Sequence, residues 1–172
     1  MNTHPFRSLA GALLALAVST SVHAIDGTVN FNGNIVDAPC TISTDGKTIA
    51  VPMQDISTGA VIDTSAPKTP FSIKLTNCST AMKQSVQVTF SGTKTGNGLI
   101  KLSQARQPVA QNVAIQLYQN GKTLSLDTLS DAVPLKKGDS EIAFAAQYVS
   151  VGGQLPVAGS ADAVAQFTLT YP

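Results

Sequence analysis

Hydrophobic and polar residues alternate along most of the chain after residue 24. Alternation with a period of two places one set of side chains on one face of an extended strand. The pattern predicts strands with apolar faces over Val29–Ile35, Phe71–Leu75, Val86–Phe90, Val113–Leu117, Ile142–Tyr148 and Ala165–Tyr171. No stretch keeps a helical period over three turns, and only a short helical turn near Met53–Ile56 is expected.

Turn-forming sequences separate these segments. Asn120-Gly121 lies between Val113–Tyr118 and Thr123–Leu126, an arrangement typical of a β-hairpin. Further turns are predicted at Asp45-Gly46, Gly96-Asn97-Gly98, Lys137-Gly138-Asp139 and Gly152-Gly153. Short strands joined by frequent turns predict an all-β fold, built as an antiparallel sandwich.

Residues 1–24 have the order of a secretory signal peptide. One cation, Arg7, precedes an apolar run over Leu9–Val18, and Val22 and Ala24 provide the small residues of a cleavage site. The apolar run would span about 15 Å as a helix, half the thickness of the hydrocarbon core, which argues against a membrane anchor. We therefore expect cleavage after Ala24 and a mature domain over residues 25–172.

The chain has two cysteines, Cys40 and Cys78. In an exported protein such a small, even count predicts one disulfide, which would stabilise the fold by about 4 kcal/mol in the chain-entropy model. The alternative is a redox or metal-binding pair. The spacing is far from Cys-x-x-Cys and no other soft ligand lies nearby, so the disulfide is favoured.

Charge and histidine content exclude several functions. Without Arg7, ten Lys and Arg residues balance ten Asp and Glu residues, and a neutral chain without a basic cluster is not expected to bind nucleic acid. Both histidines, His4 and His23, lie in the signal segment, so histidine-dependent catalysis and imidazole zinc sites are excluded. We predict no catalytic residue, no metal and no cofactor.

Acidic residues near the middle of the chain offer one enzymatic alternative. A periplasmic enzyme could use a carboxylate pair from Asp127, Asp131, Asp139 and Glu141. Lys136 and Lys137 interleave with these residues, so we interpret the cluster as solvated loop charges.

Residues 25–36 form an alternating segment at the start of the mature chain. Every second position is apolar or glycine: Gly27, Val29, Phe31, Gly33 and Ile35. Two interpretations are open. The segment is either an edge strand of its own sandwich or a strand meant for another molecule.

Both ends of the mature chain carry specific motifs. The first is Gly27-Thr-Val-Asn-Phe-Asn-Gly-Asn-Ile-Val-Asp-Ala-Pro-Cys40, and the second cysteine follows in Leu75-Thr-Asn-Cys78. Near the other end, Gly159 is followed by the alternating Ala165–Thr170 and the penultimate Tyr171. These motifs resemble those of chaperone–usher fimbrial subunits, the type 1 and P pilus pilin family.

The resemblance implies an incomplete immunoglobulin-like antiparallel β-sandwich that lacks its last strand and has one disulfide. A periplasmic pilus chaperone would lend a strand to the open groove. At the outer-membrane usher, the N-terminal extension of a neighbouring subunit would replace it, a form of β-augmentation called donor-strand exchange. The donor residues implied are Gly27, Val29, Phe31, Gly33 and Ile35; the groove and chaperone-binding residues implied are Gly159, Ala165, Phe167, Leu169 and Tyr171.

The function implied is that of a structural subunit of a bacterial surface fimbria that contributes to cell adhesion. Only Ile25 and Asp26 precede Gly27 in the mature chain, a short extension that favours a minor or adaptor subunit. The major rod subunit is one alternative. A one-domain adhesin that binds a host glycan is another, although the chain has no Trp and no room for an added lectin domain.

Overall fold

The computed structural model describes residues 38–81 and 83–172. The expected signal peptide and the strand expected over Val29–Ile35 lie outside these residues. The described elements are β1 (Thr41–Ile42), η1 (Thr44–Gly46), α1 (Thr58–Ile62), β2 (Thr69–Cys78), β3 (Ser85–Gly92), β4 (Ile100–Lys101), β5 (Val113–Gln119), β6 (Lys122–Leu124), β7 (Val133–Pro134), β8 (Gly138–Ser150) and β9 (Ala165–Thr170). No helix among the described residues is long and apolar enough to cross a membrane.

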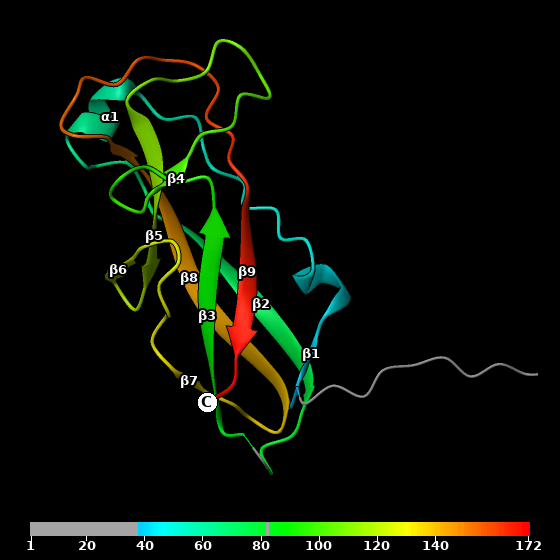
Figure 1. The fold of residues 1–172 in the computed structure, drawn as a ribbon. Coiled ribbons are helices and arrows are strands. Elements are labelled where there is room, and N and C mark those ends of the chain that lie inside the picture. The colour runs from blue at the N-terminus through cyan, green and yellow to red at the C-terminus, as the bar shows by residue number, and fades with distance from the viewer. Residues whose placement is uncertain (1–37, 82) are drawn as a thin grey trace, which may run out of the picture. The chain divides into compact units, whose positions relative to one another are not determined.

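The strands form two antiparallel sheets (Figure 1). The larger sheet has the order β1-β2-β8-β5-β4, with β6 paired to β5; the smaller has the order β7-β3-β9. β8 is the central strand of the larger sheet because its length lets it pair with β2 along one part and with β5 along the other. β9, the last strand of the chain, pairs with β3 and runs along one side of the smaller sheet (Figure 1). The predicted antiparallel sandwich is confirmed.

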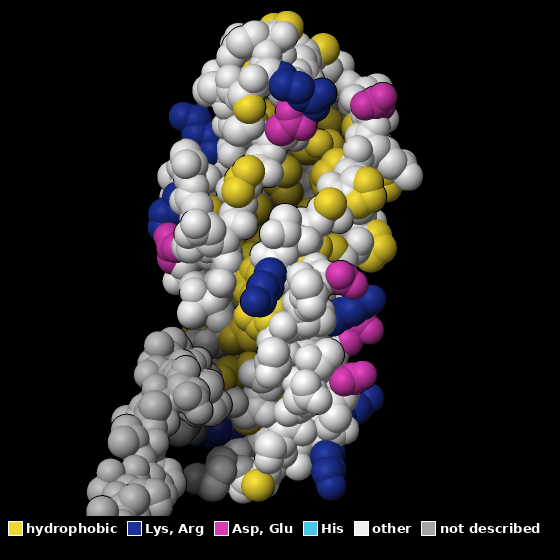
Figure 2. Space-filling model, turned by 90° about the vertical axis from the view of Figure 1, so that its right-hand side faces the viewer, with side chains coloured by type: hydrophobic (Ala, Val, Ile, Leu, Met, Phe, Trp, Pro, Cys, Tyr) yellow, Lys and Arg dark blue, Asp and Glu magenta, His cyan; other side chains and the backbone are white. Residues whose placement is uncertain are grey.

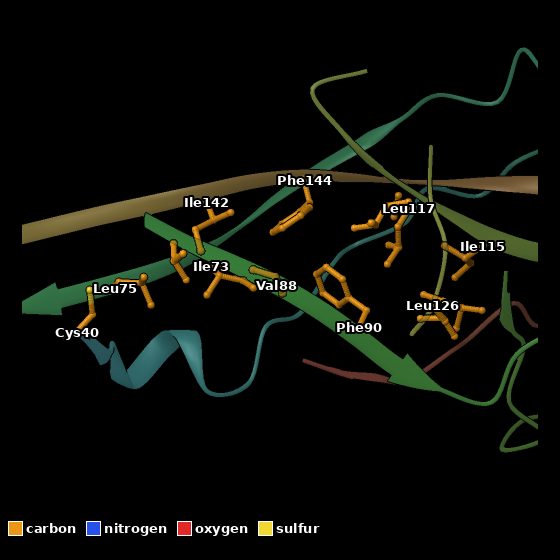
Figure 3. Packing of buried hydrophobic residues seen from close by; sticks show 14 of the residues in the cluster. Cys40, Ile73, Leu75, Val88, Phe90, Ile115, Leu117, Leu126, Ile142 and Phe144 are labelled. Atoms are coloured by element: carbon orange, nitrogen blue, oxygen red, sulfur yellow. The ribbon is translucent and has the colours of Figure 1, made fainter. Parts of the chain in front are cut away.

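The core lies between the two sheets and follows from the alternation in the sequence (Figure 3). Val88 and Phe90 of β3 are buried against Ile73 of β2 and Phe144 of β8. The Phe90 ring centroid lies 5.0 Å from that of Phe144 and 6.1 Å from that of Phe71. Burying side chains of this size contributes roughly 1.5–3 kcal/mol each, so the two inner faces supply the main stabilisation of the fold.

The hairpin predicted at Asn120-Gly121 is confirmed as the connection between β5 and β6. Asn120 has a φ of 51° and Gly121 a φ of 79°. Positive φ at both central residues is the requirement of a type I′ turn, which matches the twist of the flanking strands.

The helical turn expected near Met53–Ile56 is wrong. The α-helix α1 begins at Thr58, because Ser57 caps it: the Ser57 hydroxyl accepts a hydrogen bond from the backbone N–H of Ala60 at 3.2 Å. The segment ahead of Ser57 is instead extended, and its residues alternate between half-buried and exposed over residues 49–53.

The predicted disulfide joins Cys40 to Cys78 and connects the start of the described chain to the end of β2. β1 pairs beside it, with Thr41 opposite Thr76. The backbone N–H of Ser79 donates to the carbonyl of Pro39 at 2.8 Å. The bridge and this hydrogen bond therefore tie Pro39 and Cys40 to the end of β2.

Candidate functional site: an open groove beside β9

A large groove opens beside β9, and Figure 2 shows hydrophobic side chains exposed along its floor. Its volume is about 1480 Å³. One bank is β9 with the residues that lead into it, and the other is the segment over residues 47–56. Both sheets contribute to the floor, through Phe71, Phe90, Ile115, Leu117 and Ala146.

On the β9 side of the groove, every second side chain is half-buried. Ala165, Phe167 and Leu169 face the core and remain partly exposed, whereas the residues between them are exposed. Among the described residues β9 pairs only with β3, so one row of its backbone N–H and C=O groups lacks a strand partner. Such an edge is a template for another strand.

The opposite bank is an extended segment that the sequence analysis missed. Ile49, Val51 and Met53 line the groove and are half-buried, while Ala50 and Pro52 between them are exposed. This alternation is the signal that could have identified the bank. No strand was predicted there because of Pro52: proline has no backbone N–H to donate and argues against a paired strand.

One end of the groove is closed by two loops that cross at Gly159. The backbone N–H of Ala110 donates to the carbonyl of Ser160 at 2.9 Å, and the N–H of Ser160 donates to the carbonyl of Pro108 at 2.8 Å. A Cβ atom on Gly159 would lie 2.7 Å from the Pro108 carbonyl oxygen and would also collide with the Ala110 nitrogen. The crossing therefore requires a glycine.

Polar groups at this end pair with one another. Arg106 donates to Asp162 from Nε at 2.5 Å and from Nη2 at 2.6 Å. These hydrogen bonds lower the pKa of the exposed Asp162 carboxyl and raise the pKa of Arg106. Tyr148 donates from its hydroxyl to the carbonyl of Ala161 at 2.9 Å, and burial raises the pKa of this phenol, which favours the neutral donor. The arrangement fixes the loop and presents no activated acid or base.

The residues predicted for the groove fall into two groups. Gly159, Ala165 and Phe167 line the open groove. Leu169 and Tyr171 continue the same face but lie beyond the lining, where they pack against the core cluster. Burial raises the pKa of the Tyr171 phenol. The predicted donor residues, Gly27, Val29, Phe31, Gly33 and Ile35, lie outside the described residues.

The acidic residues considered as a catalytic cluster are exposed or take part in surface ion pairs. Asp127 pairs with Lys94, and Asp131 lies 3.6 Å from Lys122. Asp139 and Glu141 are exposed on β8. Over residues 38–81 and 83–172, no cluster of His, Cys, Asp and Glu is placed to hold a metal ion.

Comparisons with known proteins agree with this architecture. The family model described as "Fimbrial protein" matches residues 29–172. The major MR/P fimbria protein of Proteus mirabilis is 36% identical over 147 residues, which cover 84% of this chain and 83% of that protein. The probable major fimbrial subunit LpfA of Escherichia coli O157:H7 is 34% identical over 169 residues, which cover 93% and 94%.

Solved structures show the same fold. A subunit in the structure of a chaperone–usher pilus matches with a TM-score of 0.65 at 25% identity, over 90% of this chain and 100% of that one. The P pilus rod subunit PapA matches with a TM-score of 0.64 at 24% identity, over 78% and 100%. This chain therefore belongs to the fimbrial protein family: it is a structural subunit of a chaperone–usher fimbria at the cell surface, and not an enzyme.

Proposed function

We propose that the groove beside β9 accepts a donor strand from a neighbouring subunit, so that the protein polymerises into a fimbria by donor-strand exchange. One observation carries the proposal: a groove of about 1480 Å³ with a hydrophobic floor lies along a strand that has a free edge among the described residues. The edge offers backbone hydrogen bonds and the groove offers an apolar surface. An extended segment with alternating apolar residues satisfies both at once.

Residues 25–36 of a second copy, or of a related subunit, fit this requirement. Val29, Phe31 and Ile35 share one face of the segment and would enter the groove. Full burial of these three side chains contributes roughly 5–9 kcal/mol before the cost of ordering the segment. Backbone hydrogen bonds to β9 add roughly 0.5–1.5 kcal/mol each.

The same exposed features explain a need for a chaperone. An apolar strip beside a free strand edge promotes aggregation before the donor arrives. We propose that a periplasmic chaperone occupies the groove first and binds the C-terminal strand through Gly159, Ala165, Phe167, Leu169 and Tyr171. The outer-membrane usher is the proposed site at which the donor replaces it.

Periplasmic expression with and without the cognate chaperone tests the proposal. With the chaperone, we expect a 1:1 complex; without it, we expect degradation or aggregation, because the groove stays open. The readout is the yield of soluble subunit and the mass of the species that contains it. A soluble monomer at equal yield without the chaperone would contradict the proposal.

The place of the subunit in the fimbria stays a prediction. The short extension ahead of Gly27 favours an adaptor, whereas the similar proteins of Proteus mirabilis and Escherichia coli are named as major subunits. Quantitative mass spectrometry of purified fimbriae distinguishes an adaptor from a major subunit. An adaptor contributes a trace of the mass, and a rod subunit contributes most of it.

Gly159 provides a test of how the closed end of the groove is built. Gly159→Ala is expected to destabilise the chaperone-bound subunit by about 1–3 kcal/mol or more, because the added Cβ overlaps backbone atoms of Pro108 and Ala110. Thermal unfolding of the purified complex measures the change. Gly96→Ala is the matched control, since its Cβ would meet nothing within 4 Å. Equal melting temperatures for the two variants would refute the steric argument.

A further inference from the structure

The outward face of the smaller sheet carries no charge. Neither β3 nor β9 contains a charged residue, and their outward positions hold only Ser, Thr and Gln. The register places these side chains in three cross-strand pairs: Gln87 opposite Thr170, Thr89 opposite Thr168, and Ser91 opposite Gln166. The larger sheet differs, since Lys74 and Glu141 are exposed and lie opposite each other on it.

Among the described residues, the row of outward side chains on β9 has a neighbouring strand on one side only. Gln166, Thr168 and Thr170 are exposed, whereas their partners on β3 are half-buried. β3 is flanked on its other side as well, because the N–H of Ser130 donates to the carbonyl of Val88 at 2.8 Å. The β9 row therefore borders, along its free side, the groove that the proposed donor would fill.

The proposed donor segment presents matching chemistry. If Val29, Phe31 and Ile35 point into the groove, the residues at the even-numbered positions point outward, next to the β9 row. These outward residues are Thr28, Asn30, Asn32 and Asn34. Asparagine is depleted in strands, so three of them at alternate positions call for a reason beyond the strand itself.

We propose that the outward amides and hydroxyls of the donor form a cross-strand hydrogen-bond ladder with Gln166, Thr168 and Thr170, and that this ladder selects donors with an uncharged outward row. The inference rests on the proposed donor-strand exchange and adds the residues that decide which donor is accepted. Cross-strand polar pairs stabilise a sheet, and like charges placed opposite each other destabilise it. The two rows lie beside each other whichever way the donor runs.

The test uses the chaperone-bound mature subunit and an excess of labelled synthetic peptide of residues 25–36. Replacing Asn30, Asn32 and Asn34 together by Ala is expected to weaken peptide binding at least about 3-fold, since each lost pair is worth about 1.4- to 5-fold. Replacing the same three by Thr, which keeps a hydrogen-bonding group, is expected to restore binding to within about 2-fold.

A charge-reversal pair tests the contact directly. A peptide with Lys at positions 30, 32 and 34 is expected to bind the Thr168→Glu subunit about 5-fold more tightly than the Thr168→Lys subunit at low salt. The difference should shrink at about 1 M salt, where screening acts within a few ångströms.

A Phe31→Ser peptide distinguishes a failure of the proposed ladder from a failure of donor-strand exchange, the function on which the ladder rests. If that peptide fails to bind while all outward variants bind like the native peptide, the ladder is wrong and donor-strand exchange stands. If the native peptide itself does not bind, both are wrong. Weaker binding of the Ala peptide, rescue by Thr and charge-dependent binding at Thr168 together support the ladder.

Discussion

Deletion of residues 25–35 is expected to abolish incorporation of the subunit into fimbriae while leaving its chaperone complex intact. The deletion removes Val29, Phe31 and Ile35, and with them roughly 5–9 kcal/mol of apolar burial in the neighbouring subunit. A loss of that size lowers the equilibrium constant for the association of the two subunits by more than a thousandfold. The groove itself is built from residues 42–168 and keeps all its walls.

Two measurements check this expectation. Size-exclusion chromatography of periplasmic extracts should show the truncated subunit with the chaperone at native yield, and fimbriae isolated from the same cells should lack it. A control subunit with a scrambled order of residues 25–35 keeps the length, composition and net charge of the segment but breaks its alternation. This control should behave like the deletion. Loss of the folded, chaperone-bound domain in the deletion would show instead that residues 25–35 are an ordinary edge strand of their own sandwich.

Gly33→Leu is expected to block assembly nearly as completely as the deletion. Gly33 lies in the same alternating register as Val29, Phe31 and Ile35, so its missing side chain would face the groove. We infer that the groove is shallow at the position that Gly33 would occupy, so that a side chain is excluded there. A leucine there would lift the donor from β9 and break several backbone hydrogen bonds, each worth roughly 0.5–1.5 kcal/mol.

Gly33→Ala is the matched control for this substitution. It removes the conformational freedom of glycine at the same position but adds only one methyl group, so it is expected to assemble closer to the native level than Gly33→Leu. Assembly of both variants is followed by the laddering of polymers on gels without heat denaturation. The steric account is wrong if the Gly33→Leu subunit polymerises at the native rate or if both variants fail equally.

The strands could be predicted from the sequence because their inner and outer residues differ so clearly. The alternation over Ile142–Tyr148 lies within β8, and that over Ala165–Tyr171 includes β9. The disulfide followed from the cysteine count, and the hairpin from Asn120-Gly121. Each of these signals is local, or follows from the exported state of the chain.

The groove could not be derived in the same way, because it depends on which strands are neighbours. An apolar face such as Ala165–Tyr171 has the same pattern whether it lies in a closed core or beside a gap. The bank formed by Ile49, Val51 and Met53 was missed because Pro52 interrupts it. The closing loops depend on the approach of Gly159 to Pro108, a contact between residues 51 positions apart in the chain.

We expect the sandwich to stay incomplete until a donor enters the groove. The most direct measurement is heat stability of the truncated subunit, residues 36–172, refolded from denaturant with and without a synthetic peptide of residues 25–36. We predict aggregation without the peptide, and with it a soluble 1:1 complex that resists heat. A soluble monomer with the same melting temperature in both samples would contradict the account.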